Sequence, residues 1–192
     1  MGAAGDMLMG ALYELLPDSE KDLFLKSMNS LFPNEIMLNA VSSEKCGIWG
    51  TKMDAELPDM DIPQEHANEH NHLHTSYPEM LEKIDHLFVS SFVKEHAKAV
   101  YTLIGNAESA AHHTDISQIH FHEVGTLDAL MDVIGCCLLL ELLSPEQIIA
   151  SPVHVGSGTV RCAHGILPVP APATDRKSTR LNSSHRACSC HR

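Results

Sequence analysis

The residues best suited to metal or proton chemistry lie close together in the sequence: His120, His122, Glu123, Asp128 and Asp132. The two histidines belong to the run HFHEVG. In an extended segment both imidazoles share one face, and the phenylalanine between them points into the body. The two aspartates are one turn apart on the apolar helix expected next, so they also share a face. Two imidazoles and two carboxylates thus meet at one end of one element, which predicts a metal or polar-ligand site.

A structural role is the alternative for the two aspartates. A carboxylate in the first turn of a helix complements the positive end of the helix dipole, which is sufficient to explain Asp128. It does not explain Asp132, which lies a turn further in among apolar residues. A buried carboxylate is normally paired, protonated or bound to a metal, so we favour a functional role for the cluster.

A second candidate is a histidine-rich stretch within residues 58–77, which lack periodicity and are expected to form a long acidic loop. Imidazole is a good ligand for nickel, copper and zinc, and a His-rich loop is typical of metal capture or delivery. A solvated loop with accidental histidines is the alternative. The candidate ligands are His66, His70, His72 and His74.

The run GAAGD at the start of the chain leads into an expected helix. Free backbone N–H groups at a helix N-terminus can bind a phosphate, which makes Gly2 and Gly5 candidates for ligand binding. Asp6 could cap the helix or bind a divalent ion. A tight turn before the helix is the alternative.

A third candidate is a glycine-rich segment near residue 160. Glycines allow a ligand to approach the backbone closely, and a lone arginine suits a carboxylate or phosphate. Cys162 and His164 would lie on one face if extended and could bind a metal. A glycine-rich surface loop is the alternative. The phosphate-binding candidates are Gly156, Ser157, Gly158 and Arg161.

The end of the chain differs from the rest. Residues 175–185 read as the translation of a common short-read sequencing adapter, so we interpret residues 175–192 as a non-native, disordered tail and residues 1–174 as one domain. A natural disordered basic tail is the alternative. The tail holds five of the 13 Lys and Arg residues and one of the 25 Asp and Glu residues. Without it, the net charge of −12 becomes −16.

This acidic composition excludes several classes of partner. A strongly negative surface repels nucleic acid and anionic membranes and attracts cations. No apolar run reaches the length of about 18 residues needed to span a membrane. The four cysteines before residue 175 form neither a CxxC motif nor a disulfide framework, which indicates a reducing, cytoplasmic setting.

Hydrophobic periodicity predicts a mixed α/β (α+β) fold, a helix-rich single domain with short strands, incomplete at both ends. Helices are expected over residues 6–16, 19–31, 78–88, 91–112 and 127–143, the last capped by Thr126. Strands are expected over residues 35–45 and 48–57, joined by a tight turn at Cys46-Gly47, and over 119–124 and 148–155.

Three blocks together resemble one known family, the LarC family of nickel insertion proteins. The blocks are GAAGDMLM at Gly2–Met9, IHFHEVGTLDALMD at Ile119–Asp132 and GSGTVRCAHGILPVPAP at Gly156–Pro172. The resemblance covers essentially all of residues 1–174, and the histidine-rich loop lies where the family carries one.

The resemblance implies a lyase that inserts Ni²⁺ into pyridinium-3,5-bisthiocarboxylic acid mononucleotide. The product is the nickel-pincer cofactor of lactate-racemase-type client enzymes, and the reaction uses CTP with Mg²⁺ or Mn²⁺. The implied roles are nickel capture by His66–His74, nickel binding by His120, His122 and Asp128 or Asp132, and phosphate binding by Arg161 and Gly156–Gly158.

The chain also departs from the family pattern. Family members begin with a strand before the GAAGDM block and continue into a C-terminal domain associated with CTP. We therefore expect this chain to bind nickel without completing CTP-dependent insertion. Two alternatives remain: a nickel or zinc storage or chaperone module without catalysis, and a hydrolase with a zinc-bound water at His120 and His122.

Overall fold

The structure is a computed structural model of the 192-residue chain. It describes residues 4–33, 36–56, 75–121, 123–151, 155–162, 165–171 and 173–174. In these parts the helices are α1 (Gly5–Glu14), α2 (Asp18–Leu31), α3 (Tyr77–His86), α4 (Ser91–His112) and α5 (Leu127–Leu143). The strands are β1 (Met37–Lys45), β2 (Ile48–Glu56), β3 (Thr75–Ser76), β4 (His120–Phe121), β5 (Thr159–Cys162) and β6 (Gly165–Pro168). They form three antiparallel pairs, β1–β2, β3–β4 and β5–β6. The predicted helix-rich mixed α/β class is confirmed.

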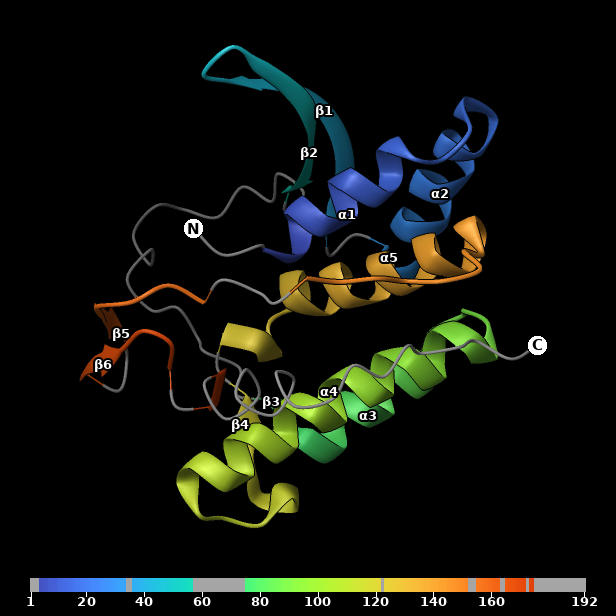
Figure 1. Cartoon of the computed structure of the whole chain (residues 1–192). Helices are drawn as coiled ribbons and strands as arrows, with labels where there is room; N and C mark the ends of the chain where they lie inside the picture. Colours follow the sequence, from blue (N-terminus) through green and yellow to red (C-terminus); the bar gives the residue numbers. More distant parts are fainter. Residues whose placement is uncertain are drawn as a thin grey trace, which may run out of the picture.

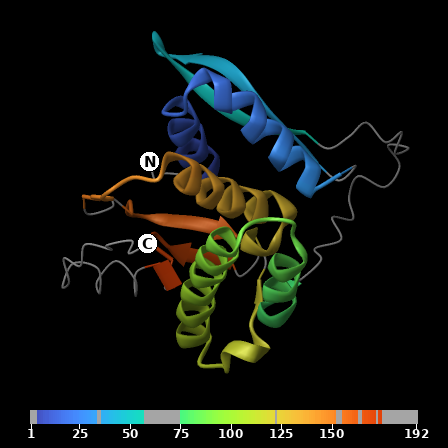
Figure 2. The same ribbon diagram turned by 90° about the vertical axis from the view of Figure 1, so that its right-hand side faces the viewer.

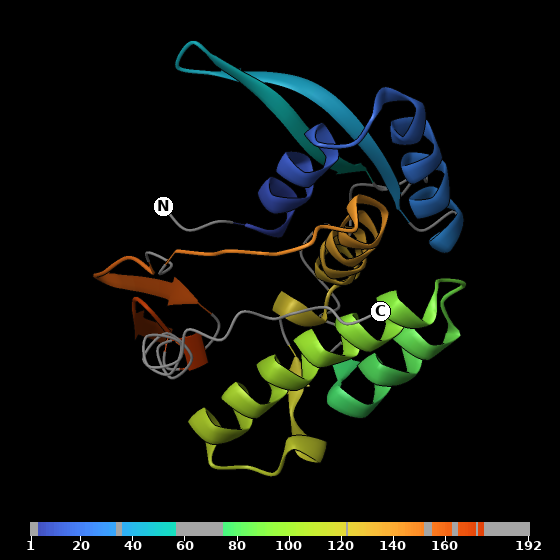
Figure 3. The ribbon, with the colours of Figure 1, turned by 45° about the vertical axis from the view of Figure 1, so that its right-hand side comes forward.

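Helix α5 lies at the centre of the packing. It contacts α1 and α4. Figures 1 and 3 show α1, α2 and the β1–β2 ribbon on one side of α5, with α3 and α4 on the other. A helix between two layers must be apolar on more than one face, which accounts for the composition of residues 127–143. As predicted, the Thr126 side chain caps this helix by accepting a hydrogen bond from the Ala129 N–H group at 3.3 Å.

The predicted β1–β2 ribbon is present, with its turn at Cys46 and Gly47. Both residues have positive φ angles, 53° and 79°, as a two-residue hairpin turn requires. Leu38 and Met53 near the base of the ribbon are buried. Figure 2 shows the ribbon lying over α1 and α2, with its tip projecting beyond them. The core therefore anchors only one end of the ribbon.

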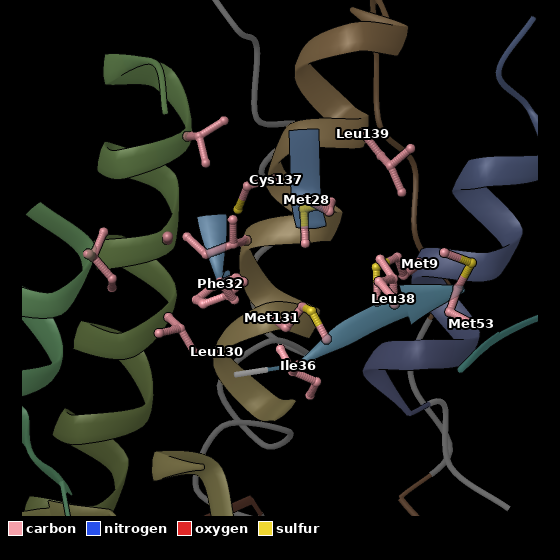
Figure 4. Packing of buried hydrophobic residues seen from close by; sticks show 14 of the residues in the cluster. Met9, Met28, Phe32, Ile36, Leu38, Met53, Leu130, Met131, Cys137 and Leu139 are labelled. Carbon is pink, nitrogen blue, oxygen red and sulfur yellow. The ribbon is translucent and has the colours of Figure 1, made fainter. Parts of the chain in front are cut away.

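The core between α1, α2, the ribbon and α5 is rich in methionine. Met9, Met28, Met53 and Met131 come from four different elements and are all buried (Figure 4). Methionine side chains are flexible and fill irregular gaps between such elements. A Cβ atom at Gly135 of α5 would clash with the Met9 Sδ atom and would lie 3.3 Å from the Met28 Cε atom. The absence of a side chain at that position therefore leaves room for Met9 of α1 to pack against α5.

Two strand predictions are wrong in part. Of the described residues among 119–124, only His120–Phe121 form a strand, because the Glu123–Gly125 segment is a 3-10 turn that redirects the chain into α5. In the predicted strand over 148–155, residues 148–151 and 155 are irregular, and residues 152–154 lie outside the described part. Strand pairing occurs instead within the glycine-rich segment, as β5 and β6.

No helix in the described ranges is long and apolar enough to cross a membrane.

Candidate functional site

The HFHEVG turn is anchored by its phenylalanine. Strand β4 pairs with β3, so that Phe121 lies opposite Thr75. The Phe121 side chain is 1% exposed, and its ring centroid lies 5.7 Å from that of Tyr101 and 6.4 Å from that of Tyr77. His120 is exposed. The predicted alternation is thus confirmed for these two residues, whereas His122 lies outside the described residues.

Two buried side chains hold the turn that follows. The Thr75 hydroxyl donates a hydrogen bond to the Gly125 carbonyl at 3.1 Å, and the Tyr101 hydroxyl donates to the Val124 carbonyl at 3.2 Å. Burial raises the pKa of Tyr101, so its phenol stays protonated and remains a donor. A Cβ atom at Gly125 would lie 2.8 Å from the Phe121 Cβ atom. The turn therefore requires glycine at this position.

The half-buried Asp132 carboxylate faces the N-terminus of α1. That helix has no side-chain cap of its own at Ala4, and the Asp6 backbone N–H group donates a hydrogen bond to Asp132. A carboxylate from another helix thus acts as the cap and complements the helix dipole. A Cβ atom at Gly5 would lie 2.7 Å from the Asp132 Cβ atom, so α1 approaches this closely only because Gly5 lacks a side chain.

Three carboxylates interact at this point of the fold. The pKa of Asp132 is raised to about 6, first by burial and then by the nearby charges of Asp128 and Asp6, against the lowering effect of the Asp6 hydrogen bond. Such a cluster is stabilised by a proton or a cation. The α1 N-terminus, proposed from sequence as a phosphate site, therefore has surroundings that favour a cation.

The two cysteines of α5 are neutral thiols. Burial, followed by the Asp132 charge, raises the pKa of Cys136 to about 12, and burial raises that of Cys137 to about 11. The Cys136 Sγ atom lies 3.8 Å from the Gly5 carbonyl oxygen. Because a thiol must be deprotonated to bind a metal well, these residues act in packing.

His120 lies opposite Ser76 in the β3–β4 pair, next to the start of α3. The pKa of the Glu79 carboxyl at the start of α3 is lowered mainly by the hydrogen bond that it accepts from the Ser76 backbone N–H group at 2.7 Å. The charge of His120 lowers this pKa further. Ser76 and Glu79 form a capping box. His120 is therefore placed beside the α3 N-terminus.

The described residues do not by themselves complete a metal site: among them, no three His, Cys, Asp or Glu side chains are grouped so that they could hold an ion. Glu123 begins the 3-10 turn and Cys162 ends β5. The remaining predicted residues outside the described ranges are Gly2, His66, His70, His72, His74 and His164.

The predicted phosphate-binding segment forms the approach to β5. Gly156 and Gly158 have φ angles of 79° and 104°, and the Gly158 carbonyl accepts a hydrogen bond from the Val169 N–H group at 2.9 Å. Ser157 and Arg161 are exposed. The β5–β6 hairpin stands apart from the helices in Figures 1 and 3. An exposed arginine on a hairpin is accessible to an anion.

Sequence reasoning missed an open groove between the end of α2, β3, one face of α3 and the start of α5. Its volume is about 570 Å³. Because residues from four elements line the groove, the sequence indicates it only through the row of polar residues along α3. The apolar residues lining it are Leu31, Phe32, Leu87, Leu127 and Leu130.

Comparison with known proteins identifies the family of the chain. A family model described as "Nickel insertion protein" matches residues 1–183. The chain belongs to this nickel insertion family. The match runs past residue 174, where the adapter-like tail was predicted to begin. No solved structure matches the chain.

Curated relatives of this nickel insertion family include two named pyridinium-3,5-bisthiocarboxylic acid mononucleotide nickel insertion protein. The one from Lactiplantibacillus plantarum is 38% identical over 182 residues, which cover 90% of this chain and 43% of the relative. The one from Desulfitobacterium hafniense is 39% identical over 173 residues, which cover 90% of this chain and 40% of the relative. The chain therefore spans about two fifths of the length of these relatives.

The raised pKa of Asp132 predicts a pH-dependent effect of Asp132→Asn. Folding favours the protonated carboxyl, so the contribution of this group to stability is lost as pH rises from about 4 to about 6. The asparagine should therefore stabilise the metal-free protein by about 1–2 kcal/mol at pH 7.5, after allowance for solvent screening, and by little at pH 4.

Urea unfolding at both pH values measures this difference, with Asp22→Asn, an exposed position on α2, as the control. An equal effect of Asp132→Asn at both pH values would show that the carboxyl is not titrating as described.

Proposed function

We propose that this chain performs the nickel-binding part of Ni²⁺ insertion into pyridinium-3,5-bisthiocarboxylic acid mononucleotide. The observation that carries the proposal is family membership across residues 1–183, together with two relatives named for that reaction. Nickel is the metal substrate, and the product serves a lactate-racemase-type client. The buried, uncharged thiols of α5 and the absence of disulfides among Cys46, Cys136 and Cys137 are compatible with a cytoplasmic setting.

In this proposal the nickel ligands come from the HFHEVG turn and the start of α5. His120 and His122 supply imidazoles, Asp128 or Asp132 supplies a carboxylate, and Glu123 or Asp6 accepts a proton. Two observations support this assignment. Hydrogen bonds from Thr75 and Tyr101 hold the turn, and a bound cation would offset the repulsion among the carboxylates of Asp6, Asp128 and Asp132. The histidines of His66–His74, with Cys162 and His164, would gather the ion, and the Gly156–Arg161 segment would hold the nucleotide phosphate.

The complete reaction is proposed for the longer family members, as a lyase that uses CTP with Mg²⁺ or Mn²⁺. Because the chain spans about two fifths of its relatives, we expect it to bind nickel without converting the precursor. Mass spectrometry of the precursor after incubation with the chain, Ni²⁺, Mg²⁺ and CTP should show no nickel adduct. Formation of the nickel adduct in excess over the protein would contradict the expectation that the chain binds nickel without converting the precursor.

A nickel carrier without catalysis is the second candidate. It is favoured by the four histidines within His66–His74, because a histidine-rich stretch is typical of metal capture and delivery. A carrier would hold nickel weakly and at several sites, and would be indifferent to nucleotide.

A further inference from the structure

The groove beside α3 has the dimensions of a small-molecule site. Its volume of about 570 Å³ falls within the range of about 300–1,000 Å³ typical of ligand pockets. Its floor is apolar, with Phe32 and Leu130 buried. Its polar groups are Glu79, Glu82, Lys83 and His86 along one face of α3, with Thr75 at one end. An apolar floor with a few polar groups on one wall suits a ligand with a flat ring that carries polar substituents.

Lys83 is the cation available to such a ligand. Its Nζ atom donates a hydrogen bond to the Thr75 hydroxyl at 3.2 Å. Three other lysines, Lys21, Lys52 and Lys98, are paired with aspartates, but no carboxylate in the described ranges lies within ion-pairing distance of Lys83. Glu79 nearby is already engaged by the Ser76 backbone in the capping box.

The groove also adjoins the HFHEVG turn. Thr75, which accepts the Lys83 hydrogen bond, donates its own to the Gly125 carbonyl at the end of that turn. Leu127, which lines the groove, is the first residue of α5. A ligand in the groove therefore lies next to the segment that carries the proposed nickel ligands.

We propose that this groove binds the pyridinium mononucleotide substrate, with Lys83 contacting an anionic substituent of the pyridinium ring and the ring packed against the half-buried Leu127. The proposal rests on the proposed function for its substrate class. It adds Lys83, which lies outside the three sequence blocks, and places the substrate in the groove beside α3. In a chain with a net charge of −12, an anion needs a local cation to offset repulsion.

Isothermal titration of the full chain with nicotinic acid mononucleotide, a pyridinium carboxylate mononucleotide, tests this proposal. Lys83→Met keeps the length of the aliphatic chain and removes the charge, and should weaken binding about tenfold, because hydrogen bonds to charged groups contribute about 1.5–3 kcal/mol. The matched control is Lys94→Met on α4, whose Nζ atom bonds to the Asp85 carbonyl outside the groove. It should bind like the wild type. Failure of inorganic phosphate to compete would support a contact between Lys83 and the ring carboxylate of the probe, and competition by phosphate would contradict that contact.

Equal affinity of Lys83→Met and the wild type, or no binding of the probe by the wild type, would overturn the proposal. Nickel affinity, measured in parallel, should be the same for Lys83→Met and the wild type; a loss of nickel binding in this variant would also overturn a groove-specific role. Absence of nickel binding in every variant would instead count against the proposed function, so the two failures are distinguishable.

Discussion

Replacing Phe121 with alanine is expected to lower the free energy of unfolding by about 3–5 kcal/mol, the usual cost of removing a buried phenylalanine. The side chain is 1% exposed and packs against Tyr101 and Tyr77. It also joins the α3–α4 layer to the turn before α5. Since small domains have a total stability of about 5–15 kcal/mol, this loss would remove a large share of the stability of the protein.

Urea unfolding followed by circular dichroism measures this loss. Phe121→Leu, which keeps most of the buried volume, should recover more than half of it. The neighbouring His120→Ala is the matched control, because the His120 side chain is exposed and should change stability by less than about 0.5 kcal/mol. If the alanine variants at 120 and 121 were equally stable, the turn would not be anchored as the structure shows.

Elements with strong local signals could be predicted from the sequence. The apolar run after Thr126, the Cys46-Gly47 turn and the two amphipathic segments at Tyr77–His86 and Ser91–His112 are all present. Each depends on residues that are neighbours in the chain, such as a capping hydroxyl or a glycine with positive φ.

Features that depend on distant partners could not be predicted. Gly5 and Asp132 were each singled out, but nothing in their local sequence shows that the carboxylate caps the α1 N-terminus. The length of β4 was overestimated because α3 begins at Tyr77, directly after β3, and the 3-10 turn begins at Glu123. The groove was missed because Phe32, Lys83 and Leu130 come from three separate helical regions.

Loss of both His120 and His122 is the second change with a large expected effect. Loss even of groups that only orient metal ligands costs about 10–100-fold in affinity, so loss of two ligands should weaken nickel binding more than about 100-fold. His120 is exposed, so its removal leaves the fold intact. A matched control is His96→Ala/His112→Ala, two exposed histidines on α4, which should bind nickel like the wild type.

Equilibrium dialysis of the 192-residue chain against mixed nickel and zinc tests the central claim most directly. The proteins compared are the wild type, His120→Ala/His122→Ala, the α4 control and a variant lacking residues 66–74. We predict tight nickel binding that is lost with His120 and His122 and kept in the control. If nickel binding were lost only when residues 66–74 are deleted, the chain would be a nickel carrier without an insertion site at His120 and His122. Binding of one tight zinc ion in preference to nickel would contradict the account.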